Sequence, residues 1–489
     1  MRILLAACIA LLVSETRCSA KGESGDEAAL GCAVGEVTES TAVLWARCSH
    51  AARLVVRLRR EGEEREKTER VPVAAARDFT GRVQLKDLQA STTYRYEADC
   101  ADGRSHSLGS AGEGSFTTAP ADDVAQPVRF AWSGDLGGQN VCRDAQFGYD
   151  IFDRVREQKP AFFIALGDMI YADDPCKAVG RYGNAQLPNL PVAATRTEEF
   201  WAVWRYNRGD EAFRRFLAAV PIFPVWDDHE ILNDAGPHRD TLPVARGRHL
   251  LPIALQAFLD YQPLLPPPSA PKQLYRRRRW GRHLELFLLD LRQYRDLNSR
   301  ADDGRQPKTM LGDRQRQWLL DALRQSTATW KVVISSVPIS IPTSDDERGG
   351  HDGWTSFGGR TGFKRELLDV LRALERQGTR NLVWLTTDVH FAAAFSYVPF
   401  ADNPSFEFHE FVSGPLNAGM FPKQEYDDTF GAKRLFLYGP PKPAEIPSFT
   451  EAKEWFNFGV VDADAEGALT VRIVNDKGAA VAEQRLMPQ

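Results

Sequence analysis

The stretch AFFIALGDMIYADD, residues 161–174, places a Gly-Asp pair and a tyrosine directly after a run of apolar residues. The apolar run has the length and composition of a strand that is buried on both faces. A chain that leaves such a strand either turns into water through an acidic loop or presents Asp168 and Tyr171 to a metal ion. The rest of the sequence helps to weigh these two interpretations.

Beyond residue 127, short apolar segments alternate with amphipathic helical segments. VRFAWSGD (128–135) and PIFPVWDDHE (221–230) are typical of the strands, and GDRQRQWLLDALRQS (312–326) is typical of the helices. This alternation predicts an α/β fold with largely parallel sheets, in which a β-sandwich is flanked by helices. A last alternation of apolar and polar residues predicts a hairpin of edge strands that closes a domain of residues 127–489.

Residues 28–119 show alternation with turn signals at short intervals and no helical period. Two segments, TAVLWAR (41–47) and LKDLQASTTYRYEA (85–98), resemble strands of a fibronectin type III domain. With 489 residues the chain is too long for one ordinary core. We therefore expect a small all-β sandwich in front of the α/β domain, joined to it by the linker APADDVAQP (119–127).

The first residues, 1–20, have the pattern of a secretory signal peptide. A single arginine precedes the apolar run Ile3–Val13, and small residues follow at the exit. The run is too short to span a bilayer. We therefore expect an exported protein, periplasmic or secreted, without a transmembrane segment, in a compartment that permits disulfides.

Five of the seven cysteines lie beyond the expected cleavage site. In a sandwich of the fibronectin type, Cys48 and Cys100 close strands at the same pole, so either a disulfide or two free buried cysteines fit the pattern. Cys142 and Cys176 each follow a motif strand by several residues. A disulfide that braces their two loops is favoured over a soft-metal pair, because the other candidate ligands are hard.

The charge of the chain gives no reason to expect nucleic acid as a general partner. The 61 lysines and arginines are balanced by 66 aspartates and glutamates, for a net charge of -5. One dense basic run, RRRR at 276–279, follows a proline-rich segment. It is interpreted as a solvated turn.

Four expected strands end in acids or histidines. A single such end is explained by a turn or a helix cap. In an open α/β sheet the carboxyl ends of the strands lie together, and like-charged carboxylates gathered there repel one another without a cation. The pattern therefore predicts hard or borderline cations held by oxygen and imidazole ligands. These ends carry Asp135, Asp168, the run Asp227-Asp228-His229, and the pair Asp388 and His390.

The ordered motifs resemble those of the calcineurin-like metallophosphoesterases, and among these the alkaline phosphatase D (PhoD-like) family. The resemblance covers nearly the whole chain, and the pair GDxIY and DDHE is its most specific part. The motifs are SGDLGGQN (133–140), LGDMIYADD (166–174), VWDDHE (225–230), LDLRQYRD (289–296), LGDRQRQWL (311–319) and TTDVHF (386–391).

The resemblance implies two metal ions, Fe³⁺ and Ca²⁺, with Zn²⁺ or Mn²⁺ as alternatives. Asp168 would bridge the two ions, and His229 would contact the phosphoryl group and protonate the leaving oxygen. The remaining implied ligands are Asp135, Tyr171 and His390 for the first ion, and Asp228 and Asp388 for the second.

Positions beside the first motif carry further expectations. Arg143 is a cationic partner for the phosphoryl group or a helix-surface arginine, and Asn140 binds a phosphate oxygen or caps the following helix. Gly137 stands where related phosphoesterases often have histidine. Asp135 stands where the best-known branch of the family has cysteine, so a thiolate ligand is not expected.

Two other acidic segments are interpreted as structural. Asp173 and Asp174 are not needed by the motif series and are expected to return the loop to water. Asp290 and Arg292 suggest a buried ion pair beneath the site.

The leading hypothesis is an exported, monomeric, two-metal phosphoesterase. Two metal ions activate water for in-line attack on a phosphate monoester or diester. The alternative is a calcium-stabilised binding protein with a degenerate enzyme fold, in which the sandwich performs recognition. The presence of every expected ligand type favours the enzyme.

Overall fold

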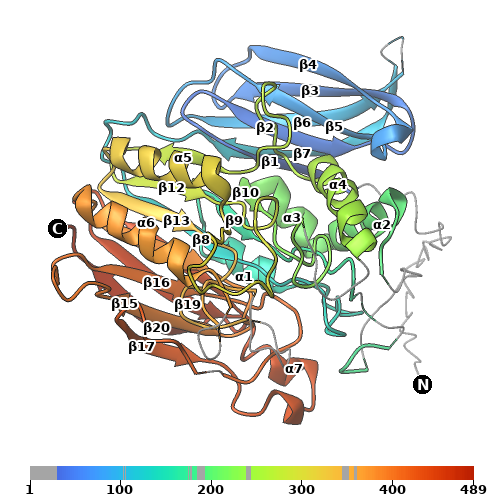
Figure 1. Cartoon of the computed structure of the whole chain (residues 1–489). Coiled ribbons are helices and arrows are strands. Elements are labelled where there is room, and N and C mark those ends of the chain that lie inside the picture. Colours follow the sequence, from blue (N-terminus) through green and yellow to red (C-terminus); the bar gives the residue numbers. More distant parts are fainter. Residues whose placement is uncertain are drawn as a thin grey trace, which may run out of the picture.

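Two large β-sheets pack face to face, helices cover their outer faces, and a smaller sheet lies at one end (Figure 1). This arrangement confirms the expected α/β fold with α-β-β-α layers and an all-β part in front. The expected signal peptide, residues 1–20, lies outside the described residues. The computed structural model describes residues 30–102, 104, 106–174, 176, 179–183, 193–237, 244–343, 352–356, 361–423 and 425–489.

The first sheet has nine strands, and the opening stretch of the sequence forms one of its central strands, β9. β9 pairs in parallel with β8 on one side and β10 on the other, as its continuous apolar run predicts. The strands in spatial order are β20 (Ala480–Leu486), β19 (Leu469–Asn475), β18 (Asn457–Ala463), β8 (Val128–Ser133), β9 (Phe163–Leu166), β10 (Ile222–Val225), β1 (Cys32–Gly35), β2 (Ala42–Arg47) and β5 (Thr80–Leu85).

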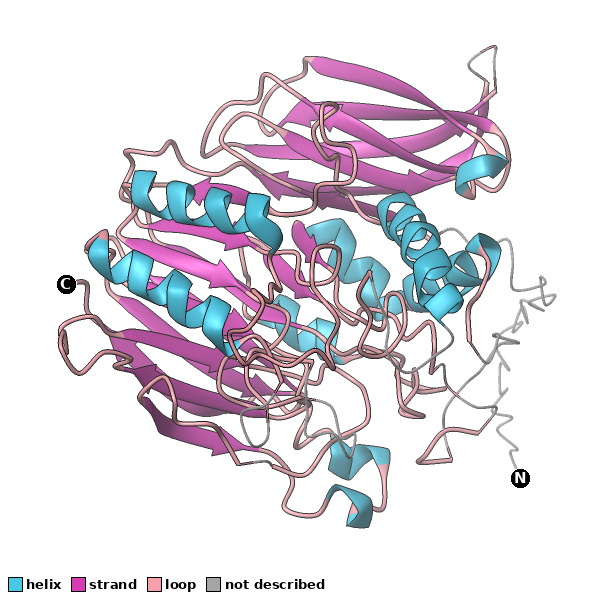
Figure 2. Cartoon of the chain, in the orientation of Figure 1, coloured by secondary structure: helices cyan, strands magenta, loops and turns pink. Residues whose placement is uncertain are grey.

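The second sheet has seven strands, with a parallel centre and antiparallel edges. Its strands in spatial order are β11 (Arg276–Trp280), β12 (Leu284–Leu288), β13 (Trp330–Ile334), β14 (Leu382–Thr386), β16 (Phe408–Val412), β15 (Ala392–Tyr397) and β17 (Ala432–Tyr438). Figure 2 shows both sheets and the helices that cover them. The helices are α1 (Ile151–Glu157), α2 (Thr197–Arg208), α3 (Glu211–Ala219), α4 (Val244–Tyr261), α5 (Gly312–Gln325), α6 (Lys364–Arg376) and α7 (Phe449–Ala452), with 3₁₀ turns η1 (Ala75–Arg77) and η3 (Pro443–Glu445).

Alternate residues of the central strands face different cores. In β9, Ile164 and Leu166 belong to the core between the sheets, whereas Phe163 and Ala165 pack with residues of α1, α2, α3 and α4. The outer face of the second sheet forms a third core with α5 and α6. Burial of both strand faces holds each strand end at a fixed place, which matters for any side chain at the exit.

The N-terminal strands are divided between two sheets. β1, β2 and β5 continue the nine-stranded sheet beyond β10, where Gly35 pairs in parallel with Ile222. A Cβ at Gly35 would lie 2.6 Å from the Ile222 carbonyl oxygen, so the contact requires glycine. The other strands form a separate four-stranded sheet, in the order β4 (Glu66–Val73), β3 (Ala52–Arg60), β6 (Thr93–Ala101) and β7 (Ser107–Thr117).

The C-terminal alternation forms three antiparallel strands rather than an edge hairpin. β18 pairs with β8 as well as with β19, so it lies inside the sheet and only β20 is at the edge. The chain end thereby covers the side of β8 that β9 leaves open.

The basic run 276–279 is a strand, not the solvated turn that its composition suggested. It forms β11, and two of its arginines, Arg276 and Arg278, form ion pairs with the buried carboxylate of Glu36. That partner lies 240 residues from Arg276 in the sequence, so local composition gave no sign of it.

Both expected disulfides, Cys48–Cys100 and Cys142–Cys176, are present. Cys32 is the free cysteine of the described chain, and it is buried. Within the described residues, no helix combines the length and apolarity that a membrane crossing requires.

Candidate metal centre

The four acidic strand ends meet at one edge of the two sheets. Asp135 follows β8, Asp168 follows β9 and Asp388 follows β14, and each has a left-handed backbone, with φ of 64°, 50° and 80° respectively. His390 adds a fourth, with φ of 57°. Non-glycine residues adopt this conformation at a cost of roughly 1–3 kcal/mol each and gather at functional sites. The packed strands hold these turns in place.

One half of the centre consists of carboxylates. Asp168, Asp227, Asp228 and Asp388 each offer an oxygen, and these atoms all lie within 4.8 Å of one another. Burial and the neighbouring charge of Asp228 raise the pKa of Asp168 well above its ordinary value. Of these four residues, Asp227 was not among the implied ligands, although it stands in the same DDHE motif.

The other half combines a carboxylate, a phenol and an imidazole. The Tyr171 hydroxyl lies 2.9 Å from Nε2 of His390, and the same nitrogen lies 3.5 Å from Oδ1 of Asp135. Burial raises the pKa of Asp135 to about 8 and lowers the pKa of His390 to about 3. An imidazole that stays neutral is ready to bind a metal, and the structure brings together the three residues implied for the first ion.

The ligand atom of His390 is selected by a contact on the other side of its ring. Nδ1 of His390 lies against the Gly419 carbonyl, so Nδ1 carries the proton and Nε2 faces Tyr171 and Asp135. The Phe421 ring stacks on the imidazole at 4.5 Å between centroids. Such backing contacts fix the tautomer and orientation of metal-binding histidines.

Unpartnered oxygens show that this donor set fits cations. A buried carboxylate oxygen normally has a hydrogen-bond donor, and an unpaired one costs free energy. In this cluster four acids each have one buried oxygen that lacks a hydrogen-bond partner among the described residues. These atoms are Asp135 Oδ1, Asp227 Oδ2, Asp228 Oδ1 and Asp388 Oδ2.

His229 contacts Asp173, an acid that was expected from the sequence to be exposed to solvent. Asp173 is buried, with 8% of its side chain exposed, and its Oδ1 lies 2.7 Å from Nδ1 of His229. Its Oδ2 accepts a hydrogen bond from the Asn233 backbone. Burial lowers the pKa of His229, but Asp173 and Asp228 outweigh it and raise that pKa to about 10. The exposed-loop expectation for Asp173 is therefore wrong; Asp174 is exposed as expected.

Glu230, the last residue of the DDHE motif, ties two strand exits together. Its carboxylate accepts hydrogen bonds from the backbone of Asp168 at 3.0 Å, Met169 at 2.8 Å and Asp227 at 2.8 Å. Burial raises its pKa to about 7. No role was assigned to Glu230 from the sequence, although its place in the motif was the available signal.

Arg292 lies behind the carboxylates. Its guanidinium is within 2.6 Å of Asp227 and 2.8 Å of Asp352, and 3.7 Å from Asp228. The expected pair with Asp290 does not form, because Asp290 instead accepts hydrogen bonds from the Trp226 indole and the Arg292 backbone. The arginine is buried as expected, but it neutralises acids of the centre itself.

The structure does not bring Arg143 and Asn140 to the cavity. Arg143 donates to the Tyr206 carbonyl at 2.8 Å and lies over the Tyr206 ring, which directs it to α2. The Asn140 carbonyl accepts a hydrogen bond from the Arg181 backbone. Gln139, one residue earlier, is the member of this loop that lines the cavity.

A cavity of about 190 Å³ opens on the carboxylate half of the centre. Its wall includes His229, His390, Gln139 and Phe421 together with several of the acids. No lysine or arginine is among the described residues that line it. An anionic group that entered this cavity would meet one cationic side chain, His229, and bound cations would supply further neutralisation.

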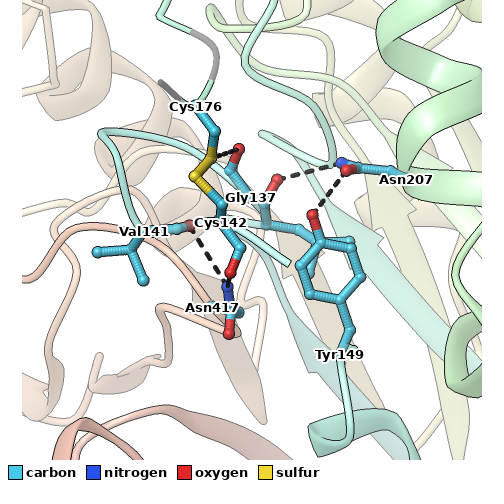
Figure 3. The surroundings of a disulfide bond; sticks show 8 residues. Gly137, Val141, Cys142, Tyr149, Cys176, Asn207 and Asn417 are labelled. Atoms are coloured by element: carbon cyan, nitrogen blue, oxygen red, sulfur yellow. Dashed lines mark hydrogen bonds between the residues drawn. A yellow bond between two sulfur atoms is a disulfide. The ribbon is translucent and has the colours of Figure 1, made fainter. Parts of the chain in front are cut away.

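Two loops of the centre are joined covalently. The Cys142–Cys176 disulfide connects the loop that follows Asp135 with the loop that follows Asp168 (Figure 3). Beside it, the Asn417 amide donates to the carbonyls of Val141 at 3.4 Å and Cys142 at 3.1 Å.

Packed sheets with acids and histidines at their strand exits define a metallophosphoesterase-like protein. The PhoD-like phosphatase family matches residues 130–467, and the N-terminal domain of PhoD-like phosphatases matches residues 14–120. The chain belongs to the PhoD-like phosphatase family.

One curated relative and two solved structures are similar to this chain, and the structures share its fold. Alkaline phosphatase D of Bacillus subtilis (strain 168) is 27% identical over 360 residues, which cover 69% of this chain and 58% of that protein. The structure of PhoD is similar with a TM-score of 0.74 at 19% identity, covering 96% of this chain and 94% of the other. A purple acid phosphatase from yellow lupin (Lupinus luteus) seeds has a TM-score of 0.60 at 11% identity, with coverage of 93% and 73%.

Proposed function

We propose that this protein is an exported, metal-dependent phosphoesterase that hydrolyses phosphate monoesters, diesters or both. The observation that carries the proposal is the gathering of four acids with buried oxygens that lack hydrogen-bond partners, two of which, Asp228 and Asp388, line one cavity. Family membership supports a phosphatase of this kind. The signal-peptide pattern of residues 1–20 supports export.

The two halves of the centre suit two different cations. Asp135, Tyr171 and His390 would hold the first, proposed as Fe³⁺, because phenolate and imidazole suit that metal. Asp228 and Asp388 would hold the second, proposed as Ca²⁺, which prefers oxygen ligands, with Zn²⁺ or Mn²⁺ as alternatives. Asp168 lies in the carboxylate cluster, and its charge also acts on Asp135 and Tyr171 of the other half, so we assign it as the bridge. When bound, such cations supply an activated water and neutralise phosphoryl charge.

The chain itself supplies the proton for the leaving oxygen. His229 lines the cavity, and Asp173 occupies its Nδ1, so Nε2 is the ring nitrogen that can face a substrate. Its place in the cavity wall and its contact with Asp173 assign His229 Nε2–H as the group that donates a proton to the departing alkoxide.

The test combines metal analysis with turnover. Purified protein should contain two metal ions per chain and should hydrolyse p-nitrophenyl phosphate or bis(p-nitrophenyl) phosphate; the ratio of the two rates separates monoesterase from diesterase. Loss of turnover after chelation and its return with metal would support metal dependence. A protein that holds only calcium and hydrolyses neither ester would instead be the binding protein of the alternative hypothesis.

The assignment of iron has its own spectroscopic test. A phenolate bound to Fe³⁺ gives a visible charge-transfer band, so the band should be present in the native protein and absent in Tyr171→Phe. Tyr96→Phe, which alters a buried tyrosine of β6 that binds the Ala218 carbonyl, is the control and should keep the band. An active, iron-containing protein without colour would contradict the role of Tyr171.

A further inference from the structure

One asparagine contacts both metal-binding turns of the nine-stranded sheet. Asn207, in the last turn of α2, is buried, and its Nδ2 donates to the Met169 carbonyl at 2.8 Å and the Leu136 carbonyl at 3.2 Å. Leu136 and Met169 directly follow Asp135 and Asp168. A single amide therefore holds the backbone carbonyl of the residue that follows each of two candidate ligands.

The amide is itself oriented by a second buried side chain. The Tyr149 hydroxyl donates to Oδ1 of Asn207 at 2.7 Å (Figure 3). An asparagine amide has two N–H donors and one carbonyl oxygen, so both donors and the acceptor are used. With Oδ1 fixed by Tyr149, the amide cannot flip, and both N–H groups stay on the ligand turns.

Gly137 makes room for this arrangement. It has a φ of 79°, and a Cβ there would lie 2.3 Å from the Tyr149 hydroxyl and 3.2 Å from Oδ1 of Asn207. Any side chain at this position would collide with the pair. The glycine of the first motif thus coincides with a tyrosine and an asparagine in the space beside it.

Other contacts attach the same turns to one another and to α2. The Leu136 backbone N–H donates to the Asp168 carbonyl at 2.7 Å, which joins the two turns directly. Arg143, farther along the first loop, binds the carbonyl of Tyr206, the residue before Asn207. Arg143 thereby fastens its loop to the helix that carries the amide.

We propose that Asn207, oriented by Tyr149, is a positioning residue that sets the relative placement of Asp135 and Asp168 and thereby the metal affinity of the centre. The inference rests on the proposed metal-dependent function and deepens it. The two aspartates have left-handed backbones, so their carboxylates keep their directions only while the turns are restrained. Partners behind the ligands of this kind typically change metal affinity by about 10- to 100-fold.

The experiment measures metal binding rather than turnover. Purified full-length protein is freed of metal with a chelator and titrated with Mn²⁺, with free Mn²⁺ followed by electron paramagnetic resonance. Asn207→Asp keeps the shape but loses both donors, and we expect its Mn²⁺ affinity to fall by about 10- to 100-fold. Tyr149→Phe removes one hydroxyl and should lower the affinity by a smaller factor, ~10-fold.

A matched control separates positioning from general loss of stability. Tyr96→Phe also removes a buried tyrosine hydroxyl, which binds the Ala218 carbonyl at 3.2 Å in the N-terminal part of the chain. It should lower the Tm of the metal-free protein about as much as Tyr149→Phe while leaving Mn²⁺ affinity unchanged. If Asn207→Asp does not fold, the comparison of the two tyrosine variants decides the question.

The outcomes distinguish this inference from the proposed function. Weaker Mn²⁺ binding by Tyr149→Phe than by Tyr96→Phe supports the positioning role. Wild-type affinity in Asn207→Asp and Tyr149→Phe overturns the positioning role and leaves the proposed function intact. A wild-type protein that binds no Mn²⁺ and cleaves no phosphate ester overturns the proposed function, and this inference falls with it.

Discussion

Two regions of the molecule bury carboxylates, and they treat them differently. Glu410, in β16, is fully buried, and its oxygens accept hydrogen bonds from the Ile339 backbone and the hydroxyls of Thr386 and Tyr397. At the strand exits, four acids each keep one buried oxygen that has no hydrogen-bond partner among the described residues. The carboxylate of Glu410 finds its hydrogen-bond donors within the described chain, whereas the acids at the strand exits do not.

The two regions differ in whether the fold alone explains a buried carboxylate. A buried acid whose oxygens all find donors is explained by the fold alone. Neighbouring acids repel one another, and among the described residues Arg292 and His229 oppose that repulsion. In the metal-free chain the repulsion is also relieved by raised pKa values, as for Asp135 and Asp168. Bound cations would relieve it as well, which is the basis of the proposed function.

The largest expected effect follows from Asp168→Asn. Because Asp168 is the proposed bridge, the amide should lower the metal content of the purified protein and reduce kcat/KM by about 1,000-fold or more. The metal-free variant should unfold at the same temperature as metal-free wild type or higher, since one of the repelling carboxylates is gone. Metal analysis, ester hydrolysis and thermal unfolding measure the three quantities.

A control for Asp168→Asn is Asp87→Asn, whose side chain is 93% exposed in the N-terminal part of the chain. It should change none of the three quantities. Near-normal turnover by Asp168→Asn would refute the bridging role and, with it, the functional interpretation of the unpartnered acids.

Asp173→Asn should have a smaller effect that falls on proton transfer alone. The variant keeps the shape of the side chain but weakens its hold on Nδ1 of His229. We expect kcat to fall by about 100-fold for phenyl phosphate and less for p-nitrophenyl phosphate, whose leaving group needs little protonation. Metal content should stay at the wild-type level, because the acid contacts the histidine.

The neighbouring residue gives the control for this test. Asp174 is exposed, so Asp174→Asn should behave as wild type with both esters. An equal loss for the two leaving groups in Asp173→Asn would exclude proton transfer as the affected step. A loss of metal would show that Asp173 supports metal binding rather than proton transfer.

The sequence predicts which acids and histidines gather at the strand exits, because their positions depend on local features. An apolar run followed by Gly-Asp ends a buried strand, and parallel strands bring such ends together, as they do for Asp168 and Asp135. The gathering of these side chains can be predicted without knowing the order of the strands in the two sheets. The fold class follows from the same alternation of strands and helices.

The sequence does not predict the contact partners of individual side chains, because these depend on the direction in which each side chain leaves the folded backbone. Asp173 and Asp174 are adjacent acids in one loop, yet only Asp173 turns inward to His229, 56 residues away. Arg143 follows the first motif, but the backbone and ring of Tyr206 direct it to α2. Glu36 and its arginine partners are likewise distant in the sequence, so composition alone misplaced the basic run.

The smallest effect on the metal centre is expected for Glu410, whose carboxylate finds its hydrogen-bond donors within the described chain. Burial raises the pKa of this carboxyl from its ordinary value of 4.5 to about 7. Between these pH values the folded chain keeps the proton and the unfolded chain releases it, so the folded state binds more protons. The free energy of unfolding should therefore fall as pH rises through this window, by about 3 kcal/mol for this group.

Glu410→Gln tests both the sign and the independence of the two regions. The amide cannot ionise, so the pH-dependent loss should be absent, and the variant should gain stability relative to wild type between pH 5 and pH 8. Urea unfolding of both proteins at the two pH values measures this difference, in which the titration of the centre cancels. Metal content and ester hydrolysis at neutral pH should match wild type, because Glu410 already has its donors within the chain. A loss of metal in the variant would show that Glu410 is electrostatically coupled to the acids at the strand exits. The two regions would then not be independent.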